Sequence, residues 1–106
     1  MGKTSQAKGA RGEREVAAIL QKHGVQARRG GSLTFGEVPD VYGLPGYHLE
    51  IKRHERLNIH AAYQQAERDS QRFQDGSPLV VHRRNREPWL CTLALEDFLS
   101  LYNQTK

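Results

Sequence analysis

The sequence predicts an α/β fold in which a central mixed β-sheet is flanked by helices. Apolar residues recur at helical spacing in three segments, other segments are strand-like, and Gly, Asp, Asn and Pro mark the boundaries. The resulting order is α-β-β-β-α-β-β-α, which is typical of helices packed on the faces of one sheet. The 106 residues suit a single domain, residues 1–106.

The N-terminal half predicts one helix and three strands. Residues 1–10 are rich in Gly, Ser and Lys, and we expect a mobile basic tail there. The apolar spacing of i, i+3, i+4 and i+7 predicts a helix from about Gly12 to His23, with Gly24 as its stop. Strands are expected at Val25–Arg29, Val38–Tyr42 and Tyr47–Arg53, the last two joined by a Gly-Leu-Pro-Gly turn.

The C-terminal half predicts a helix, two strands and a final helix. Asn58 is a suitable N-cap for a helix that runs to about Phe73, before the breaker Asp75-Gly76-Ser77-Pro78. The next strands are expected at Leu79–Arg83 and Pro88–Leu93, around a basic loop. A short helix, about Leu95–Tyr102, presents one apolar side.

Composition excludes several classes of protein. A single cysteine rules out a disulfide framework or a cysteine-rich zinc site within one chain. No apolar run approaches the ~20 residues of a membrane helix, and the polar N-terminus lacks a signal-peptide core. We therefore expect a soluble, cytoplasmic protein with no membrane contact. The 16 Lys and Arg against 12 Asp and Glu give a charge of +4, so the distribution of charge is more informative than its total.

The segment from Pro39 to Lys52 carries the chemistry. Strand alternation places His48, Glu50 and Lys52 on one face, opposite the apolar residues that pack on a helix. If the turn is the three-residue loop 44–46, Asp40 lies directly opposite Glu50, with side chains ~5 Å apart. A four-residue loop would shift this register by one residue.

Two carboxylates at this distance require a compensating cation. Lys52 supplies part of the positive charge, and Mg²⁺ is satisfied by one or two carboxylates together with water and phosphate oxygens. The alternative is a cross-strand ion pair on a solvated face, because a D…ExK pattern is short and common. His48 could approach this site, but the five histidines do not form a metal set.

Glu13 bears on the choice between these interpretations. It lies within the apolar arc of the first helix, beside Val16 and Leu20, whereas Glu15 points the other way. A carboxylate on an apolar face is costly to bury without a partner, and a metal site at the sheet edge would be such a partner. The alternative is a first-turn acid favoured by the helix dipole.

Basic residues accompany the predicted strands and the first helix. They could follow the phosphates of a nucleic acid, or could be surface charge that keeps the protein soluble. The candidates for DNA contact are Lys8, Arg11, Arg14, Arg28, Arg29, Arg53, Arg83, Arg84 and Arg86.

With Glu13, Pro39-Asp40 and Glu50-Ile51-Lys52 in this order, the chain resembles the PD-(D/E)xK nuclease superfamily. It is most similar to the small Holliday junction resolvases of archaeal type and their phage-borne relatives. The likeness covers nearly the whole chain, including residues 8–15 and the Arg-Arg-Gly-Gly-Ser segment. It implies a restriction-endonuclease-like core and a homodimer that makes paired nicks in a four-way DNA junction, using Mg²⁺ or Mn²⁺.

The resemblance also implies roles for individual residues. Asp40 and Glu50 bind the ion, Glu13 contributes directly or through water, and the backbone carbonyl of Ile51 completes the shell. Lys52 orients the water or offsets charge on the phosphate. Two further positions correspond to family features: Gln65 to a helix glutamine near the site, and Ser32 to a substrate-contacting serine.

We therefore expect a Mg²⁺-dependent endodeoxyribonuclease of DNA recombination and repair, cellular or phage-encoded, with no small-molecule cofactor. One alternative is another activity of the same superfamily, such as a flap, nicking or repair endonuclease. The other is a non-catalytic DNA-binding module.

Overall fold

The structure is a computed structural model that describes residues 2–30 and 40–105, with side chains from residue 10 onward within these ranges. Its element order is the predicted one, and the α/β class with a mixed sheet is confirmed. The elements are α1 (Gly2–Lys22), β1 (Arg28–Arg29), β2 (Val41–Tyr42), β3 (Tyr47–Arg53), α2 (Ile59–Phe73), β4 (Ser77–Arg83), β5 (Leu90–Thr92) and α3 (Leu95–Gln104).

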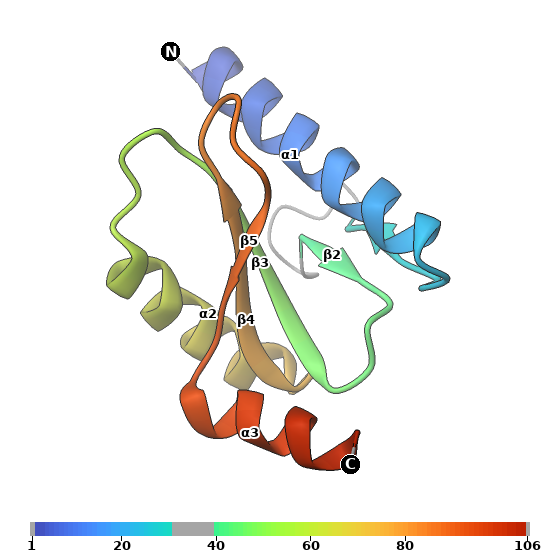
Figure 1. Cartoon of the computed structure of the whole chain (residues 1–106). Helices are drawn as coiled ribbons and strands as arrows, with labels where there is room; N and C mark the ends of the chain where they lie inside the picture. The colour runs from blue at the N-terminus through green and yellow to red at the C-terminus, as the bar shows by residue number, and fades with distance from the viewer. Residues whose placement is uncertain (1, 31–39, 106) are drawn as a thin grey trace.

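The five strands form one sheet in the order β1-β2-β3-β4-β5. β3 and β4 are parallel and are connected through α2, while the other neighbouring strands are antiparallel. Figure 1 shows α1 and α2 on either side of this sheet. β3 is therefore the central strand, with helices above and below it.

Each helix packs an apolar face on the sheet. On one face, Val16 and Ala17 of α1 are buried with Leu49 and Ile51 of β3. A Cβ atom at Gly12 would lie 3.4 Å from the Trp89 ring, so the absence of a side chain lets α1 approach closely. On the other face, small residues of α2 pack against the middle of β4: Ala62 and Ala66 contact Val80.

The polar face of β3 is covered, which the sequence analysis did not foresee. His48 and Glu50 are 1% and 3% exposed. Leu49 and Ile51 pack with α1, so alternation directs His48 and Glu50 toward α2. The side chains that carry the chemistry therefore lie in a buried, low-dielectric environment rather than on a solvated face.

Helix boundaries agree with the prediction at α2 and differ at α1. The Asn58 side chain accepts the Ala61 N–H at 3.0 Å, and the helix ends at Phe73 before a left-handed Gln74. The predicted start of the helix at about Gly12 is wrong, because α1 already begins at Gly2. The mobility expected of residues 1–10 stays a prediction. Glycine weakens a helix interior only modestly, so Gly9 and Gly12 do not interrupt it.

The last helix has no buried residue. Its apolar side chains remain open to solvent, with Leu95, Phe98 and Leu99 at 70%, 50% and 42% exposed. In Figure 1, α3 lies beyond one end of the sheet, away from α1. Among the described residues, no helix is long and apolar enough to cross a membrane.

Candidate metal and nucleic-acid site

The β2–β3 hairpin sets the position of the first acid. Val41 pairs with Leu49, and the same register, continued by one residue, puts Asp40 opposite Glu50. This is the register of the three-residue loop. Gly43 adopts φ +115, and a Cβ atom there would overlap the carbonyl oxygen of Gln26, so only glycine fits this turn.

Asp40 lies in an environment that opposes its ionisation. Burial, followed by the negative charges of Glu50 and Glu13, raises its pKa from 3.8 to about 6. The N–H of Ile51, which donates to Oδ2 of Asp40 at 3.3 Å, and the positive charge of Lys52 act in the opposite direction. At Asp40, burial and the two neighbouring carboxylates thus outweigh the Ile51 N–H and the charge of Lys52.

Glu13 reaches this cluster from α1. Its Oε1 atom accepts a hydrogen bond from Nε of Arg29 at 3.0 Å, and both side chains are partly exposed. Its charge raises the pKa of Asp40, so it lies within electrostatic range of that carboxylate. Its part in a metal site stays a prediction.

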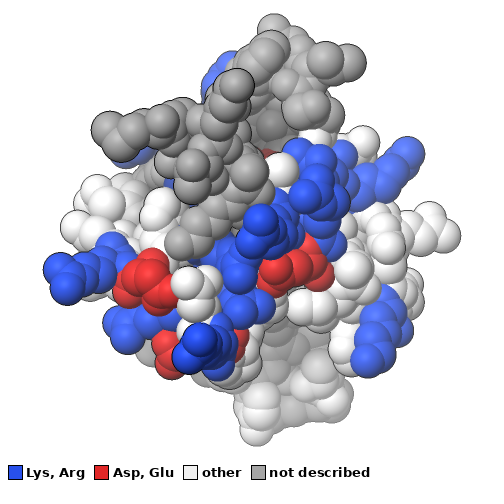
Figure 2. All heavy atoms as spheres, turned by 90° about the horizontal axis from the view of Figure 1, so that it is seen from above, with Lys and Arg blue, Asp and Glu red and all other residues white. Residues whose placement is uncertain are grey.

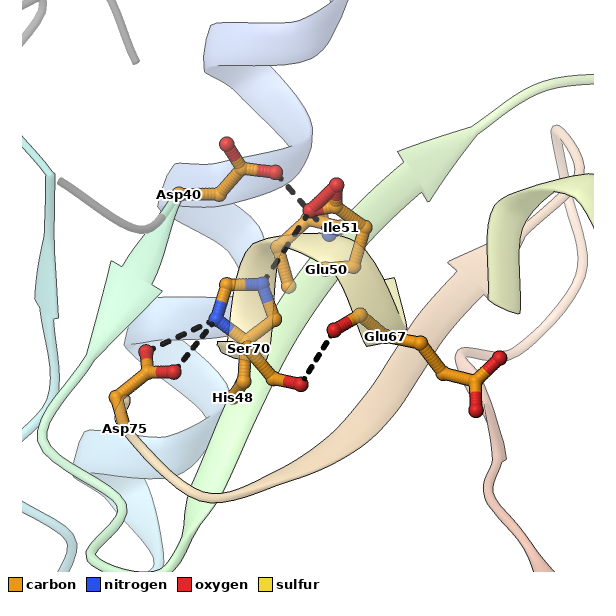
Figure 3. Close-up of polar contacts among 7 residues, drawn as sticks. All are labelled: Asp40, His48, Glu50, Ile51, Glu67, Ser70 and Asp75. Atoms are coloured by element: carbon orange, nitrogen blue, oxygen red, sulfur yellow. Dashed lines mark hydrogen bonds and ion pairs between the residues drawn. The ribbon is translucent and has the colours of Figure 1, made fainter. Parts of the chain in front are cut away.

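Glu50 also faces a buried histidine (Figure 3). Nε2 of His48 lies 3.8 Å from Oε2 of Glu50, and Nδ1 lies 2.9 Å from Oδ2 of Asp75. Burial alone would lower the pKa of this imidazole, but the two carboxylates raise it to about 9. His48 therefore carries a proton at neutral pH and supplies positive charge beneath the acids.

The structure gives fewer contacts for the other predicted site residues. Lys52 follows Glu50 on the same side of β3, is partly buried, and makes no ion pair within the described chain. Gln65 lies half-buried on α2 and forms no hydrogen bond with a described residue. Ser32 and the side chain of Lys8 lie outside what the structure describes.

The basic residues divide into two groups. Figure 2 shows a band of Lys and Arg around acidic side chains on the face seen from above. Arg83 and Arg53 contact Glu15 at 3.0 and 3.6 Å. Glu15, which was expected to point away from the apolar face of the first helix, therefore joins α1 to the sheet through these two arginines. The exposed arginines of the predicted DNA-contacting set are Arg11, Arg14, Arg28, Arg84 and Arg86.

Two residues near Glu50, Asp69 and Asp75, were not identified from the sequence. Asp69 of α2 has a carboxylate oxygen close to His48 and Glu50, with the three potential ligand atoms all within 4.8 Å of one another. Asp75, which follows the C-cap residue Gln74 of α2, contacts the histidine ring. Asp69 lies three residues after Ala66, which places it near the side of α2 that packs on the sheet. An acid at this spacing is the sequence signal that could have identified it.

Comparisons with known proteins agree with this architecture. The family model described as archaeal Holliday junction resolvase (Hjc) matches residues 4–100. Among solved structures, Hjc from the archaeal hyperthermophile Archaeoglobus fulgidus, a Holliday junction resolvase, is similar with a TM-score of 0.59 and 23% identity. That similarity covers 81% of this chain and 72% of the other, and it shows the fold. No curated protein sequence matches the chain.

Proposed function

Because the chain belongs to the archaeal Holliday junction resolvase family, we propose that it cuts four-way DNA junctions by metal-dependent hydrolysis of phosphodiester bonds. The observation that carries the proposal is the partial burial of Asp40 within electrostatic range of Glu50 and Glu13, expressed in its raised pKa. Partly buried acids that lie near one another oppose folding unless positive charge compensates them, and a divalent cation would provide that charge.

The donor set suits Mg²⁺ or Mn²⁺. These ions prefer oxygen ligands and retain water and phosphate oxygens in their shell. We infer that Asp40 and Glu50 hold the ion, that Glu13 contributes directly or through water, and that the Ile51 carbonyl completes the protein ligands. The bound ion would lower the pKa of a water molecule and polarise the scissile phosphate.

The surrounding residues prepare this site. The Ile51 N–H fixes the Asp40 carboxylate, and Arg29 holds Glu13 at 3.0 Å. Lys52 makes no ion pair with a described residue, so its ammonium group can offset the negative charge that grows on the phosphate during attack. Preorganised groups of this kind act strongly in a partly buried site because they need little reorientation.

We propose that the exposed arginines Arg11, Arg14, Arg28, Arg84 and Arg86 contact the DNA backbone. Each phosphate contact releases counterions, so the affinity for DNA should fall steeply with salt concentration. Arg53 and Arg83 position α1 through Glu15 and have less freedom to reach a phosphate.

A homodimer follows from the substrate we propose. A four-way junction offers two equivalent strands for cleavage, which two equivalent sites cut most simply. The apolar side of α3 offers a surface for that contact, since Leu95, Phe98 and Leu99 remain exposed in the single chain. Contact with a second copy would remove these three apolar side chains from water, which favours association.

The decisive experiment is cleavage of a synthetic four-way junction by the purified protein in Mg²⁺, with Asp40→Asn as control. We expect paired nicks in opposing strands from the wild type, and none from the variant. Preferential cleavage of flap or linear DNA would identify another nuclease activity of the superfamily. Salt-sensitive junction binding without metal-dependent cleavage would identify a non-catalytic module and contradict the proposal.

A further inference from the structure

The buried cluster between β3 and α2 has a composition that hydrolysis by Mg²⁺ does not require. It joins His48 and Glu50 of β3 to Asp69 of α2, with the three potential ligand atoms all within 4.8 Å of one another. His48 and Glu50 are almost fully buried, and Asp69 is partly exposed. An acid on the packed side of a helix, facing a buried acid, is unfavourable unless positive charge, from a proton on the histidine or from a metal ion, lies between them.

The histidine is oriented as metal-binding histidines are. Asp75 accepts the Nδ1 hydrogen, with its two oxygens at 2.9 and 3.0 Å from the ring nitrogen. Nε2 is buried and has no hydrogen-bond partner, and it points toward Glu50 (Figure 3). A carboxylate on one ring nitrogen, which leaves the other free, fixes the tautomer and raises the basicity of the ligand.

The backbone around the cluster is closely constrained. Gly76 adopts φ +123, and a Cβ atom there would overlap the backbone of Gly46. The chain can therefore turn tightly between α2 and β4, which brings Asp75 to the histidine. The His48 ring also stacks on Phe73 at a centroid distance of 6.0 Å, so its plane is fixed from a second side.

From this geometry we propose that His48, Glu50 and Asp69 bind a divalent transition-metal ion, such as Zn²⁺, in a site separate from the Asp40 site but sharing Glu50. Imidazole nitrogen suits Zn²⁺ and its neighbours in the first transition row, whereas Mg²⁺ prefers a shell made of oxygen atoms. The ion replaces the proton that His48 otherwise holds at Nε2. Under the proposed nuclease function, the shared Glu50 makes this ion a competitor of the catalytic one.

Cobalt binding tests the site without any measurement of activity. Metal-free protein is titrated with Co²⁺, whose visible absorption reports nitrogen and oxygen ligands, and Zn²⁺ is then used to displace it. We expect the wild type to bind one Co²⁺ through this cluster. His48→Gln and Asp69→Asn should weaken the binding at least ~10-fold. Asp75→Asn, which alters only the outer partner of the histidine, should weaken it ~10- to 100-fold.

Two controls separate this site from the catalytic one. Asp40→Asn removes a proposed Mg²⁺ ligand and should keep the histidine-dependent Co²⁺ spectrum. Glu67→Gln changes an exposed acid on the same helix as Asp69 and should bind as wild type does. The proposal is overturned by a His48→Gln spectrum equal to wild type, or by loss of the spectrum in Asp40→Asn alone.

A measurement on the unaltered protein guards against variants that fail to fold. In ¹H–¹⁵N spectra of the imidazoles, Zn²⁺ should shift the Nε2 resonance of His48 and leave Nδ1 protonated. No change at Nε2 on addition of Zn²⁺ would overturn the proposal. Because neither readout involves DNA, a positive result stands even if junction cleavage is absent, and a negative one leaves the nuclease proposal intact.

Discussion

Asp40 and Glu50 face each other across the β2–β3 pair, and the negative charge of Glu50 contributes to the raised pKa of Asp40. Asp40 directly precedes β2 and Glu50 lies within β3, and the two strands differ in character. β2 is a short strand next to the sheet edge, whereas β3 is the central strand, buried on both sides. The site thus combines Glu50, buried on the central strand, with Asp40, which is only partly buried.

Replacement of Asp40 by asparagine should stabilise the metal-free protein. The folded protein holds the Asp40 proton more tightly than the unfolded chain, since the pKa rises from 3.8 to about 6. The resulting stability is fully present below pH 3.8 and is lost as the pH rises through about 6. One pKa unit corresponds to ~1.4 kcal/mol, and solvent screens a partly exposed group, so we expect a gain of about 1–2 kcal/mol above that range.

Urea unfolding in the presence of a chelator, at several pH values, measures this effect. Glu67→Gln, which neutralises an exposed acid on α2, is the matched control and should follow the wild type. If the free energy of unfolding of Asp40→Asn has the same pH dependence as that of the wild type, ionisation of Asp40 does not destabilise the folded protein as we expect.

Lys52 should affect cleavage much more than DNA binding. Lys52→Met removes the ammonium group and keeps a long apolar stem, so we expect single-turnover cleavage to fall ~100-fold or more. Junction affinity should change only a few-fold, because one of many positive charges is lost. Arg84→Met, at an exposed arginine, is the control: it should weaken junction binding and leave single-turnover cleavage of bound DNA nearly unchanged. Equal losses of binding and cleavage in Lys52→Met would argue that the lysine merely contacts DNA.

Glu15 should contribute to stability by joining α1 to the sheet. Its carboxylate accepts hydrogen bonds from Arg83 at 3.0 Å and from the Trp89 ring at 3.2 Å, and lies 3.6 Å from Arg53. Glu15→Gln should lower the free energy of unfolding by about 1 kcal/mol or more, since hydrogen bonds to charged groups are lost. Glu87→Gln affects a more exposed pair with Arg84 at 4.0 Å and should change it by less than ~0.5 kcal/mol. Chemical denaturation of the two variants provides the comparison, and a smaller effect for Glu15 would contradict it.

The apolar side of α3 should control assembly. Phe98→Glu puts a charge in the middle of the exposed Leu95, Phe98 and Leu99 surface, and we expect a monomer in sedimentation velocity. Gln104→Glu adds the same charge on the opposite side of the helix and should leave the dimer intact. A Phe98→Glu dimer as stable as wild type would place the interface elsewhere.

The sequence predicted those parts of the fold that local signals determine. The bounds of β3 and the start and end of α2 follow from alternation, from the Asn58 cap and from the Asp75-Gly76 break, and the structure confirms them. The register of Asp40 followed from turn length alone. The helical residues before Gly12 were missed because Gly and Ser lower helix propensity without preventing a helix.

The remaining features depend on distant parts of the chain. His48 meets Asp75, which is 27 residues away, because the crossover through α2 returns to the same end of β3. The Glu15 contacts likewise join residues 68 and 74 positions apart. Periodicity within one segment carries no information on such pairs. A cytoplasmic location, a phage origin and the individual site roles stay predictions.

The two-sided burial of β3 has a consequence for how this chain can change during evolution. Substitution at one position of the strand alters either the core beneath α1 or the acids beneath α2. Deletion of His48, with the preceding residues held in place, would exchange the two sets: it would turn Leu49 toward Asp69 and Glu50 into the apolar layer. Lineages that keep this protein should therefore hold the length of this segment constant.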